Sequence, residues 1–335
     1  MTTPTLTLDR PLDMHLHLRQ GDMLRRVAPL SAETFSGAIV MPNLVPPVDS
    51  LDALLRYRND ILAAVTPRNF TPFMTLFFRD YSPRELEAAA GIATAVKLYP
   101  DGVTTNSASG IRDLFHHTPV FEAMQDLGLP LLVHGESHGF VMDRERDFLP
   151  VYDRLAQTFP RLRIVMEHIT TADAVALLDR HDNLSATVTL HHLLITLDDL
   201  AGGLLRPHLF CKPIAKRPED RQALVDAVLR GHPKLVFGSD SAPHPVHAKE
   251  ASGCAAGVFT APHALAHLAE FFDRHHALHR MQPFVSDFAR ALYPIQPAPK
   301  TVTLARTPHN IPDRYHDVIP FRAGETCSWS VTSIT

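Results

Sequence analysis

Cysteine is scarce in this chain of 335 residues, which contains only Cys211, Cys254 and Cys327. Three such scattered residues cannot form a disulfide framework, and their spacing is not that of a zinc finger. We therefore expect a protein of a reducing compartment, the cytoplasm. The sequence also lacks a basic N-terminal segment followed by an apolar one, and no run approaches the ~18 apolar residues of a membrane span. These absences predict a soluble protein that is not exported.

Charge of one sign is not concentrated anywhere in the chain. The 32 Lys and Arg residues and 36 Asp and Glu residues give a formal net charge of −4, and no basic run stands out. Nucleic acids and membranes are therefore not expected as partners, and a small-molecule substrate is favoured. No Gly-rich phosphate-binding motif follows a predicted strand. Histidine, in contrast, is abundant, with 21 residues, and this raises the question of a metal site.

Eight short apolar segments have the composition of buried strands. They are residues 12–18, 37–41, 73–78, 94–99, 131–134, 163–169, 184–190 and 234–240. Segments with helical periodicity alternate with them, among them residues 50–65, 82–91, 111–128 and 217–231. This alternation is typical of a parallel sheet covered by helices on both faces. Eight such units predict an α/β fold, a (β/α)8 TIM barrel, and a doubly wound open sheet is the alternative.

The domain organisation follows from length and composition. A chain of this length fits either two ordinary domains or one barrel with additions, but no break in composition favours two. We predict a single barrel domain over residues 1–335, with a C-terminal extension from about residue 258 to residue 335. The extension contains an apolar helix and a Pro-rich tail, which we expect to pack against the outside or the bottom of the barrel.

A lysine lies within the apolar strand predicted at residues 94–99. Lys97 is flanked by Val96 and Leu98, and the nearest acidic residue in this stretch is Asp101, beyond a Pro-Asp-Gly turn. A buried cation is costly unless it is paired. One explanation is a lysine whose aliphatic stem is buried while its ammonium group reaches water.

Potential metal ligands occur at the ends of five of the predicted strands. They are His15 and His17 on the first strand, Lys97 on the fourth, His134 on the fifth, His168 on the sixth and Asp240 on the eighth. Residues two apart on a strand point to the same side, so the two histidines of the first strand can bind one ion. Each histidine alone could be an ordinary core or surface residue. A metal site, however, explains why so many lie where the strands end, at the face that carries the chemistry of TIM barrels.

Seven motifs in this arrangement point to a known family. They are MHLHLR (14–19), MPNLVPP (41–47), VKLYPDGVTTNS (96–107), VHGE (133–136), EHITT (167–171), CKPIAKR (211–217) and GSDSAPH (238–244). With them, essentially the whole chain resembles the metal-dependent amidohydrolase superfamily and, within it, the short, stand-alone type of dihydroorotase.

The resemblance implies a centre of two zinc ions per subunit. The Lys97 amine would add to carbon dioxide and bridge the two ions as an N6-carboxylysine. By the same correspondence His15, His17 and Asp240 would bind the more buried zinc, and His134 and His168 the more exposed one. Burial lowers the pKa of an amine and so favours the uncharged form that this addition needs. The resemblance thus offers a second explanation of the buried lysine.

The reaction implied is the reversible interconversion of L-dihydroorotate and N-carbamoyl-L-aspartate in de novo pyrimidine (UMP) biosynthesis. A hydroxide that bridges the metals would attack the ring amide. Asp240 would act as general acid and base, passing a proton to the leaving ring nitrogen. The family also implies a homodimer.

Substrate contacts are implied by the same motifs. Arg19, Asn43 and His244 would bind the carboxylate of the substrate. The segment 101–110 has the composition of a mobile lid, in which the hydroxyl groups of two threonines would act as donors. The lid threonines are Thr104 and Thr105. The backbone groups of Lys212 and Ala256 would contact the ring amides.

Other functions stay open at this point. A hydantoinase or dihydropyrimidinase would share the metals and the carboxylated lysine, but it needs no carboxylate-binding Arg19, Asn43 and His244. An adenosine-deaminase-like enzyme with one metal needs no lysine on the fourth strand. A catalytically silent barrel that serves as a scaffold is an alternative of another class, and bound zinc together with turnover would exclude it.

Overall fold

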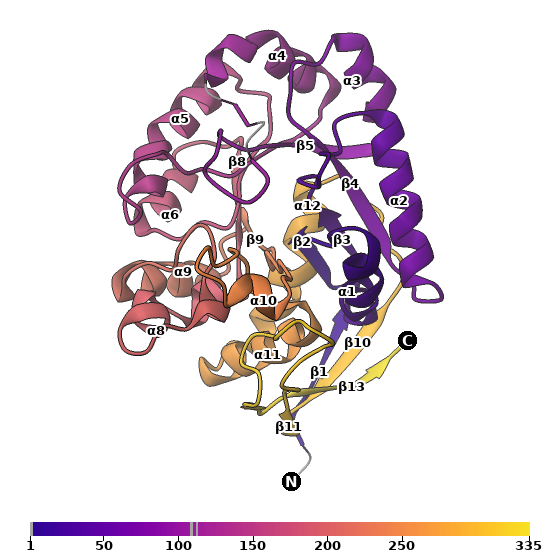
Figure 1. Cartoon of the computed structure of the whole chain (residues 1–335), viewed down its shortest axis with the longest axis vertical. Coiled ribbons are helices and arrows are strands. Elements are labelled where there is room, and N and C mark those ends of the chain that lie inside the picture. Colours follow the sequence, from indigo (N-terminus) through magenta and orange to yellow (C-terminus); the bar gives the residue numbers. More distant parts are fainter. Residues whose placement is uncertain (1–2, 108–109, 112) are drawn as a thin grey trace.

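The computed structural model describes residues 3–107, 110–111 and 113–335. At its centre, eight parallel strands form a nearly closed barrel in which each strand pairs with the next one along the chain (Figure 1). The strands are β2 (Leu12–Leu16), β3 (Gly37–Val40), β4 (Thr71–Phe77), β5 (Ala93–Leu98), β6 (Leu131–Val133), β7 (Ile164–Met166), β8 (Leu184–Val188) and β9 (Leu235–Phe237). The predicted TIM barrel is confirmed, and the open doubly wound sheet is excluded.

The barrel closes just beyond its last strand. The backbone N–H of Asp240 donates to the His15 carbonyl at 2.8 Å, and the N–H of His17 donates to the Ser241 carbonyl at 3.1 Å. These bonds join the segment that follows β9 to β2. Closure therefore brings the first and the last of the predicted ligand-bearing segments side by side.

Helices follow the strands, and most of them cover the outside of the barrel (Figure 1). They are α1 (Gly21–Thr34), α2 (Leu51–Val65), α3 (Pro83–Ala90), α4 (Thr118–Leu127), α5 (Arg144–Thr158), α6 (Ala172–Leu178), α7 (Leu190–Leu194), α8 (Leu197–Ala201), α9 (Pro218–Arg230), α10 (Val246–Lys249), α11 (Ala264–Arg274) and α12 (Phe288–Leu292). The N-terminus of α3 carries a capping box in which Ser82 and Glu85 satisfy each other's backbone N–H groups. The helix expected at residues 111–128 differs, because Leu114–His117 form a 3-10 turn and α4 begins only at Thr118.

The interior of the barrel is filled by apolar side chains. Met14, Ile39, Phe73, Leu132 and Val165 belong to one buried cluster, which also includes residues of α12 and the segment after it. The helices pack on a second, larger cluster outside the strands. The apolar filling excludes water from the barrel, so polar chemistry is confined to the end where the strands finish.

The C-terminal extension differs from the expected Pro-rich tail because it contains strands. A second sheet is antiparallel and has the order β1 (Thr5–Asp9), β10 (Thr301–Ala305) and β13 (Ser330–Ile334). A short antiparallel pair, β11 (His309–Asn310) and β12 (Thr326–Cys327), lies between β10 and β13 in the sequence. The N-terminal strand thus pairs with a segment almost a chain length away. Among the described residues, no helix is long and apolar enough to cross a membrane.

Candidate metal centre

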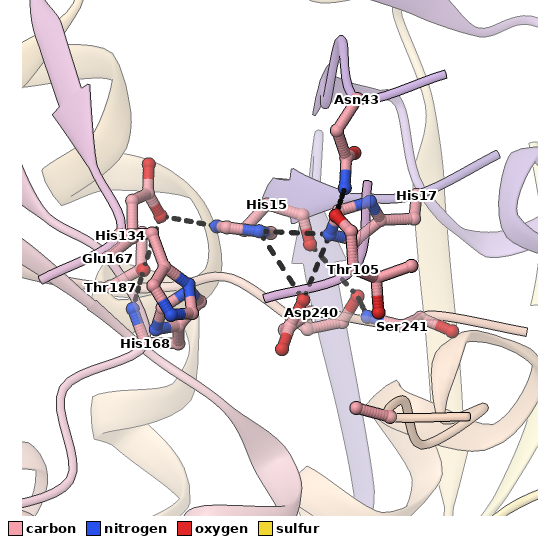
Figure 2. Close-up of polar contacts among 12 residues, drawn as sticks. His15, His17, Asn43, Thr105, His134, Glu167, His168, Thr187, Asp240 and Ser241 are labelled. Carbon is pink, nitrogen blue, oxygen red and sulfur yellow. Dashed lines mark hydrogen bonds and ion pairs between the residues drawn. The ribbon is translucent and has the colours of Figure 1, made fainter. Parts of the chain in front are cut away.

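The residues predicted as metal ligands lie together at the C-terminal ends of the barrel strands, and Figure 2 shows the four histidines and Asp240 among them. Five of them, His15, His17, His134, His168 and Asp240, line one cavity. The sixth, Lys97, is wholly buried and interacts electrostatically with Asp240. Residues from five separate segments of the chain therefore converge on one site.

His15, His17 and Asp240 form the first ligand group. The Nε2 atoms of the two histidines are 3.3 Å apart. Asp240 Oδ1 lies 3.4 Å from His15 Nε2 and 3.1 Å from His17 Nε2. Burial lowers the pKa of both histidines, that of His17 well below its usual value. Two neutral imidazoles and a carboxylate are suitable ligands for a divalent metal ion.

A β-bulge directs the first group into the site. The pairing of β2 with β3 shifts register between Asp13 and Leu16. Met14 belongs to the cluster inside the barrel, whereas Leu16 belongs to the cluster outside it, so the alternation of the strand changes at this point. Bulges next to active sites commonly redirect a side chain in this way. Here the bulge turns His15 and His17 toward Asp240.

His134 and His168 form the second ligand group. His134 Nδ1 and His168 Nε2 are 3.1 Å apart, and the rings of His15 and His168 lie with centroids 5.0 Å apart. Burial lowers the pKa of His168 well below its usual value. The two groups are thus neighbours, which suits two metal ions that share a bridging ligand.

Lys97 is the buried cation of this site. Its side chain has no exposed surface, and among the described residues its Nζ has no hydrogen-bond partner. This burial excludes the explanation in which the ammonium reaches water. Burial lowers the pKa of Lys97 to about 8, against the opposing effects of Glu167 and Asp240. A buried, unpartnered amine with a lowered pKa fits the uncharged nucleophile that a carboxylated lysine requires.

The structure also shows three buried carboxylates that sequence reasoning did not single out. Glu167 Oε2 lies 2.5 Å from His15 Nδ1, and Glu136 Oε2 lies 2.8 Å from His134 Nε2. Asp13 accepts from the Ser239 N–H at 2.7 Å. Hydrogen bonds of this kind fix the ring orientation of metal-binding histidines. Glu136 and Glu167 lie within the motifs VHGE and EHITT, but only the fold shows which ligand each one contacts.

Three of the predicted site residues have an unusual backbone conformation. Arg19, His168 and Asp240 have φ angles of 58°, 41° and 44°, in the left-handed region that residues other than glycine rarely adopt. Such strained positions are enriched at active sites, where the surrounding structure holds them in place. Three of the predicted site residues therefore share an unusual backbone state.

Six of the seven predicted substrate-binding residues line this cavity. Those that line it are Arg19, Asn43, Thr104, Thr105, Lys212 and Ala256. His244 lies behind Arg19, with its Nε2 2.9 Å from an Arg19 guanidinium nitrogen and 3.0 Å from the Ala256 carbonyl oxygen. Arg19 Nε donates to the Pro243 carbonyl at 3.0 Å. The guanidinium is thus oriented by its neighbours before any ligand binds.

The segment expected to form a lid lies against the cavity. Asn43 Nδ2 donates to the Thr105 carbonyl at 3.1 Å, and Asn106 Nδ2 donates to the Asn43 carbonyl at 3.0 Å. Residues 108 and 109 of the expected lid lie outside the described residues. The contacts with Asn43 hold the segment near the metal-ligand set.

Comparisons with known proteins agree with this geometry. A family model described as Amidohydrolase matches residues 13–279. A dihydroorotase of Helicobacter hepaticus is 45% identical over 98% of this chain and 98% of its own length. One of Halorhodospira halophila is 45% identical over 97% of this chain and 98% of its own. The chain belongs to the dihydroorotase family of amidohydrolases.

Solved structures extend this result. Dihydroorotase of Campylobacter jejuni matches with a TM-score of 0.95 at 48% identity, covering 99% of both chains. Dihydroorotase of Saccharomyces cerevisiae, in complex with 5-fluoroorotic acid, matches with a TM-score of 0.92 at 36% identity over 98% of each chain. An L-hydantoinase of Arthrobacter aurescens has a TM-score of 0.81 but only 16% identity, so it shares the fold alone.

Membership of the dihydroorotase family implies a metal ion, and the residues present fit one. His15, His17 and Asp240 place their ligand atoms within 4.8 Å of one another. The buried Lys97 amine, which has no hydrogen-bond partner among the described residues, interacts electrostatically with Asp240 of this set. This donor set of imidazoles and a carboxylate is typical of zinc sites with an open position.

Proposed function

We propose that the chain has dihydroorotase activity and catalyses the reversible hydrolysis of L-dihydroorotate to N-carbamoyl-L-aspartate in de novo pyrimidine biosynthesis. The relatives named dihydroorotase, which match along almost the whole chain, support this activity. The observation that carries the proposal is the combination of a metal-ligand set around a buried Lys97 with the Arg19 guanidinium at the rim of the same cavity. The first feature suits amide hydrolysis, and the second suits a substrate with a carboxylate.

We propose a centre of two zinc ions. His15, His17 and Asp240 would hold one ion, and His134 and His168 the other, with a carboxylated Lys97 between them. The neutral amine of Lys97 would form a new N–C bond with carbon dioxide and lose one proton, which gives an anionic carbamate. Its lack of a hydrogen-bond partner among the described residues supports this role. When bound, the two ions would supply a Lewis acid for the amide carbonyl and a hydroxide nucleophile at neutral pH.

Asp240 would move the proton of the reaction. Its carboxylate would accept a proton from the attacking nucleophile and donate it to the ring nitrogen as the amide bond breaks. Burial raises the pKa of Asp240, and the neighbouring histidines oppose this rise. Its Oδ1 lies 3.4 Å from His15 Nε2 and 3.1 Å from His17 Nε2, within the candidate ligand set, and this supports the assignment.

Arg19, Asn43 and His244 would bind the substrate carboxylate, and Thr104 and Thr105 would cover it from the lid. The guanidinium can donate two parallel hydrogen bonds to a carboxylate. The bond from Arg19 to the Pro243 carbonyl supports this role, because it leaves the remaining N–H groups in a defined direction. The backbone groups of Lys212 and Ala256 would then contact the ring amides.

We also propose that the protein is a cytoplasmic homodimer organised as one barrel domain with its extension. The free thiols of Cys211, Cys254 and Cys327 support a reducing compartment. Light scattering during size-exclusion chromatography would test the dimer, which predicts twice the chain mass of 37.2 kDa.

Removal of the Lys97 amine tests the function. Purified parent protein should contain zinc and turn over dihydroorotate, but it should not hydrolyse dihydrouracil, which has no carboxylate for Arg19. Lys97→Ala, assayed with excess zinc, should lose activity and recover part of it when a short carboxylic acid replaces the carbamate. A mutant as active as the parent would refute the bridging role. A parent without zinc and without turnover would instead favour a silent scaffold.

A further inference from the structure

Lys249, at the end of α10, is a second buried lysine near the cavity. Its side chain is about 2% exposed. Its Nζ donates to the carbonyl oxygens of Phe210 at 2.9 Å, Ala255 at 2.8 Å and Gly257 at 2.8 Å. An ammonium group has three N–H donors, so these bonds use all of them. Lys249 therefore acts as a clamp on backbone carbonyls.

The clamped carbonyls border the residues that face the substrate. Phe210 lies two residues before Lys212, and Ala255 and Gly257 flank Ala256. Lys212 and Ala256 both line the cavity that contains the metal-ligand set. The Gly257 N–H also donates to the Phe210 carbonyl at 2.8 Å. Lys249 thus joins two loops, residues 210–212 and 255–257, that meet at the cavity wall.

The second loop is also confined from its other side. Gly257 has a φ of 152°, and a Cβ atom built there would lie 2.3 Å from the Ala242 carbonyl oxygen. The loop is therefore packed against Ala242 on one side and bonded to Lys249 on the other. With the carbonyls on both sides of Ala256 held in this way, the peptide planes around Ala256 have little freedom to rotate.

We propose that Lys249 is a positioning residue for substrate specificity, which orients the backbone groups of Lys212 and Ala256 toward the amide edges of the substrate ring. The proposal rests on the proposed function and extends it. A backbone group discriminates between ligands only when its direction is fixed, because a hydrogen bond weakens steeply as donor and acceptor lose their alignment. Lys249 would act through the two loops and not by touching the substrate.

Lys300 provides a matched control. It is about 5% exposed, and its Nζ donates to the carbonyl oxygens of Ala32, Glu33 and Phe35. Burial lowers the pKa of both lysines to about 8. These carbonyls, however, lie at the end of α1, just before β3 begins, and therefore at the opposite end of the barrel. The two lysines share their chemistry and differ in their distance from the cavity.

Lys249→Met and Lys300→Met compare the two clamps in the zinc-loaded enzyme. Both variants should unfold at a lower temperature than the parent. Only Lys249→Met should raise KM for dihydroorotate, by about tenfold, with a much smaller change in kcat and with unchanged zinc content. Its Ki for orotate, which has the ring amides, should rise in parallel. Its Ki for succinate, which has carboxylates but no ring amide, should stay that of the parent.

Lys249→Gln keeps two N–H donors without the charge and should show the same selective loss to a smaller degree. Unchanged KM in a folded Lys249 variant would overturn the proposal, and so would an equal loss of orotate and succinate binding. Failure of both Lys249 variants to fold while Lys300→Met folds would assign Lys249 a purely structural role and also overturn it. A parent enzyme without dihydroorotate turnover would refute the proposed function itself, which separates the two failures.

Discussion

Replacement of Glu167 by glutamine should weaken metal binding and leave the fold intact. The Glu167 carboxylate is buried, with Oε2 2.5 Å from His15 Nδ1 and 2.7 Å from the Thr187 hydroxyl that donates to it. Burial opposes ionisation of Glu167, but its electrostatic interactions with His15 and Lys97 and these hydrogen bonds lower its pKa overall. An ionised acceptor at Nδ1 keeps the proton there and leaves the lone pair of His15 Nε2 for a metal ion.

The size of the effect follows from the bond that changes. A hydrogen bond with a charged partner contributes about 1.5–3 kcal/mol, and a neutral one about 0.5–1.5 kcal/mol. Glu167→Gln keeps the shape of the side chain but replaces a charged acceptor by a neutral one. The hydrogen bond to His15 should therefore weaken by about 1–2 kcal/mol. This corresponds to about 5- to 30-fold weaker metal binding, which overlaps the range of about 10- to 100-fold for partners of metal-binding histidines.

Competition with a chromophoric chelator measures this loss without any assay of activity. The zinc affinity of Glu167→Gln should fall by the stated factor, while its circular dichroism spectrum stays that of the parent. Glu270→Gln is the matched control, because Glu270 is also a buried carboxylate and accepts from the Ser328 N–H and hydroxyl on the outside of the barrel. The Glu270→Gln substitution should lower the free energy of unfolding and leave the zinc affinity unchanged. A Glu167→Gln protein that binds zinc as tightly as the parent would refute the reasoning.

Two further predictions concern substrate binding and acid stability. Arg19→Lys should raise KM for dihydroorotate about tenfold with unchanged zinc content, because an ammonium group cannot reproduce the two parallel hydrogen bonds of a guanidinium. An unchanged KM would count against the binding of the substrate carboxylate by Arg19. Burial, and then Arg322, lower the pKa of His267 from 6.5 to about 3. Between these values only the unfolded chain binds the proton, so stability falls as the pH decreases from 6.5 toward 3. In urea unfolding at pH 7 and pH 5, His267→Gln should show a smaller loss than the parent, and an equal loss would exclude this contribution.

The sequence by itself determined the barrel and predicted the candidate ligand set. The eight strands were visible because apolar runs alternate with helical periodicity, and both are local patterns. The ligands were visible for a geometric reason. All strands of a parallel barrel point the same way, so residues that end consecutive strands, such as His134 and His168, must meet at one face. The family motifs then suggested a role for each residue.

Only the tertiary structure decided how these residues are oriented and supported. The bulge in β2 that turns His15 inward, the bond of Glu167 to His15 and the pairing of β1 with β10 all depend on contacts between distant segments. So does the clamp of Lys249 on the carbonyls of two loops. Local sequence patterns report which face of an element is apolar, but they do not report which distant group a buried polar side chain meets. That choice is made by the packing of the whole chain.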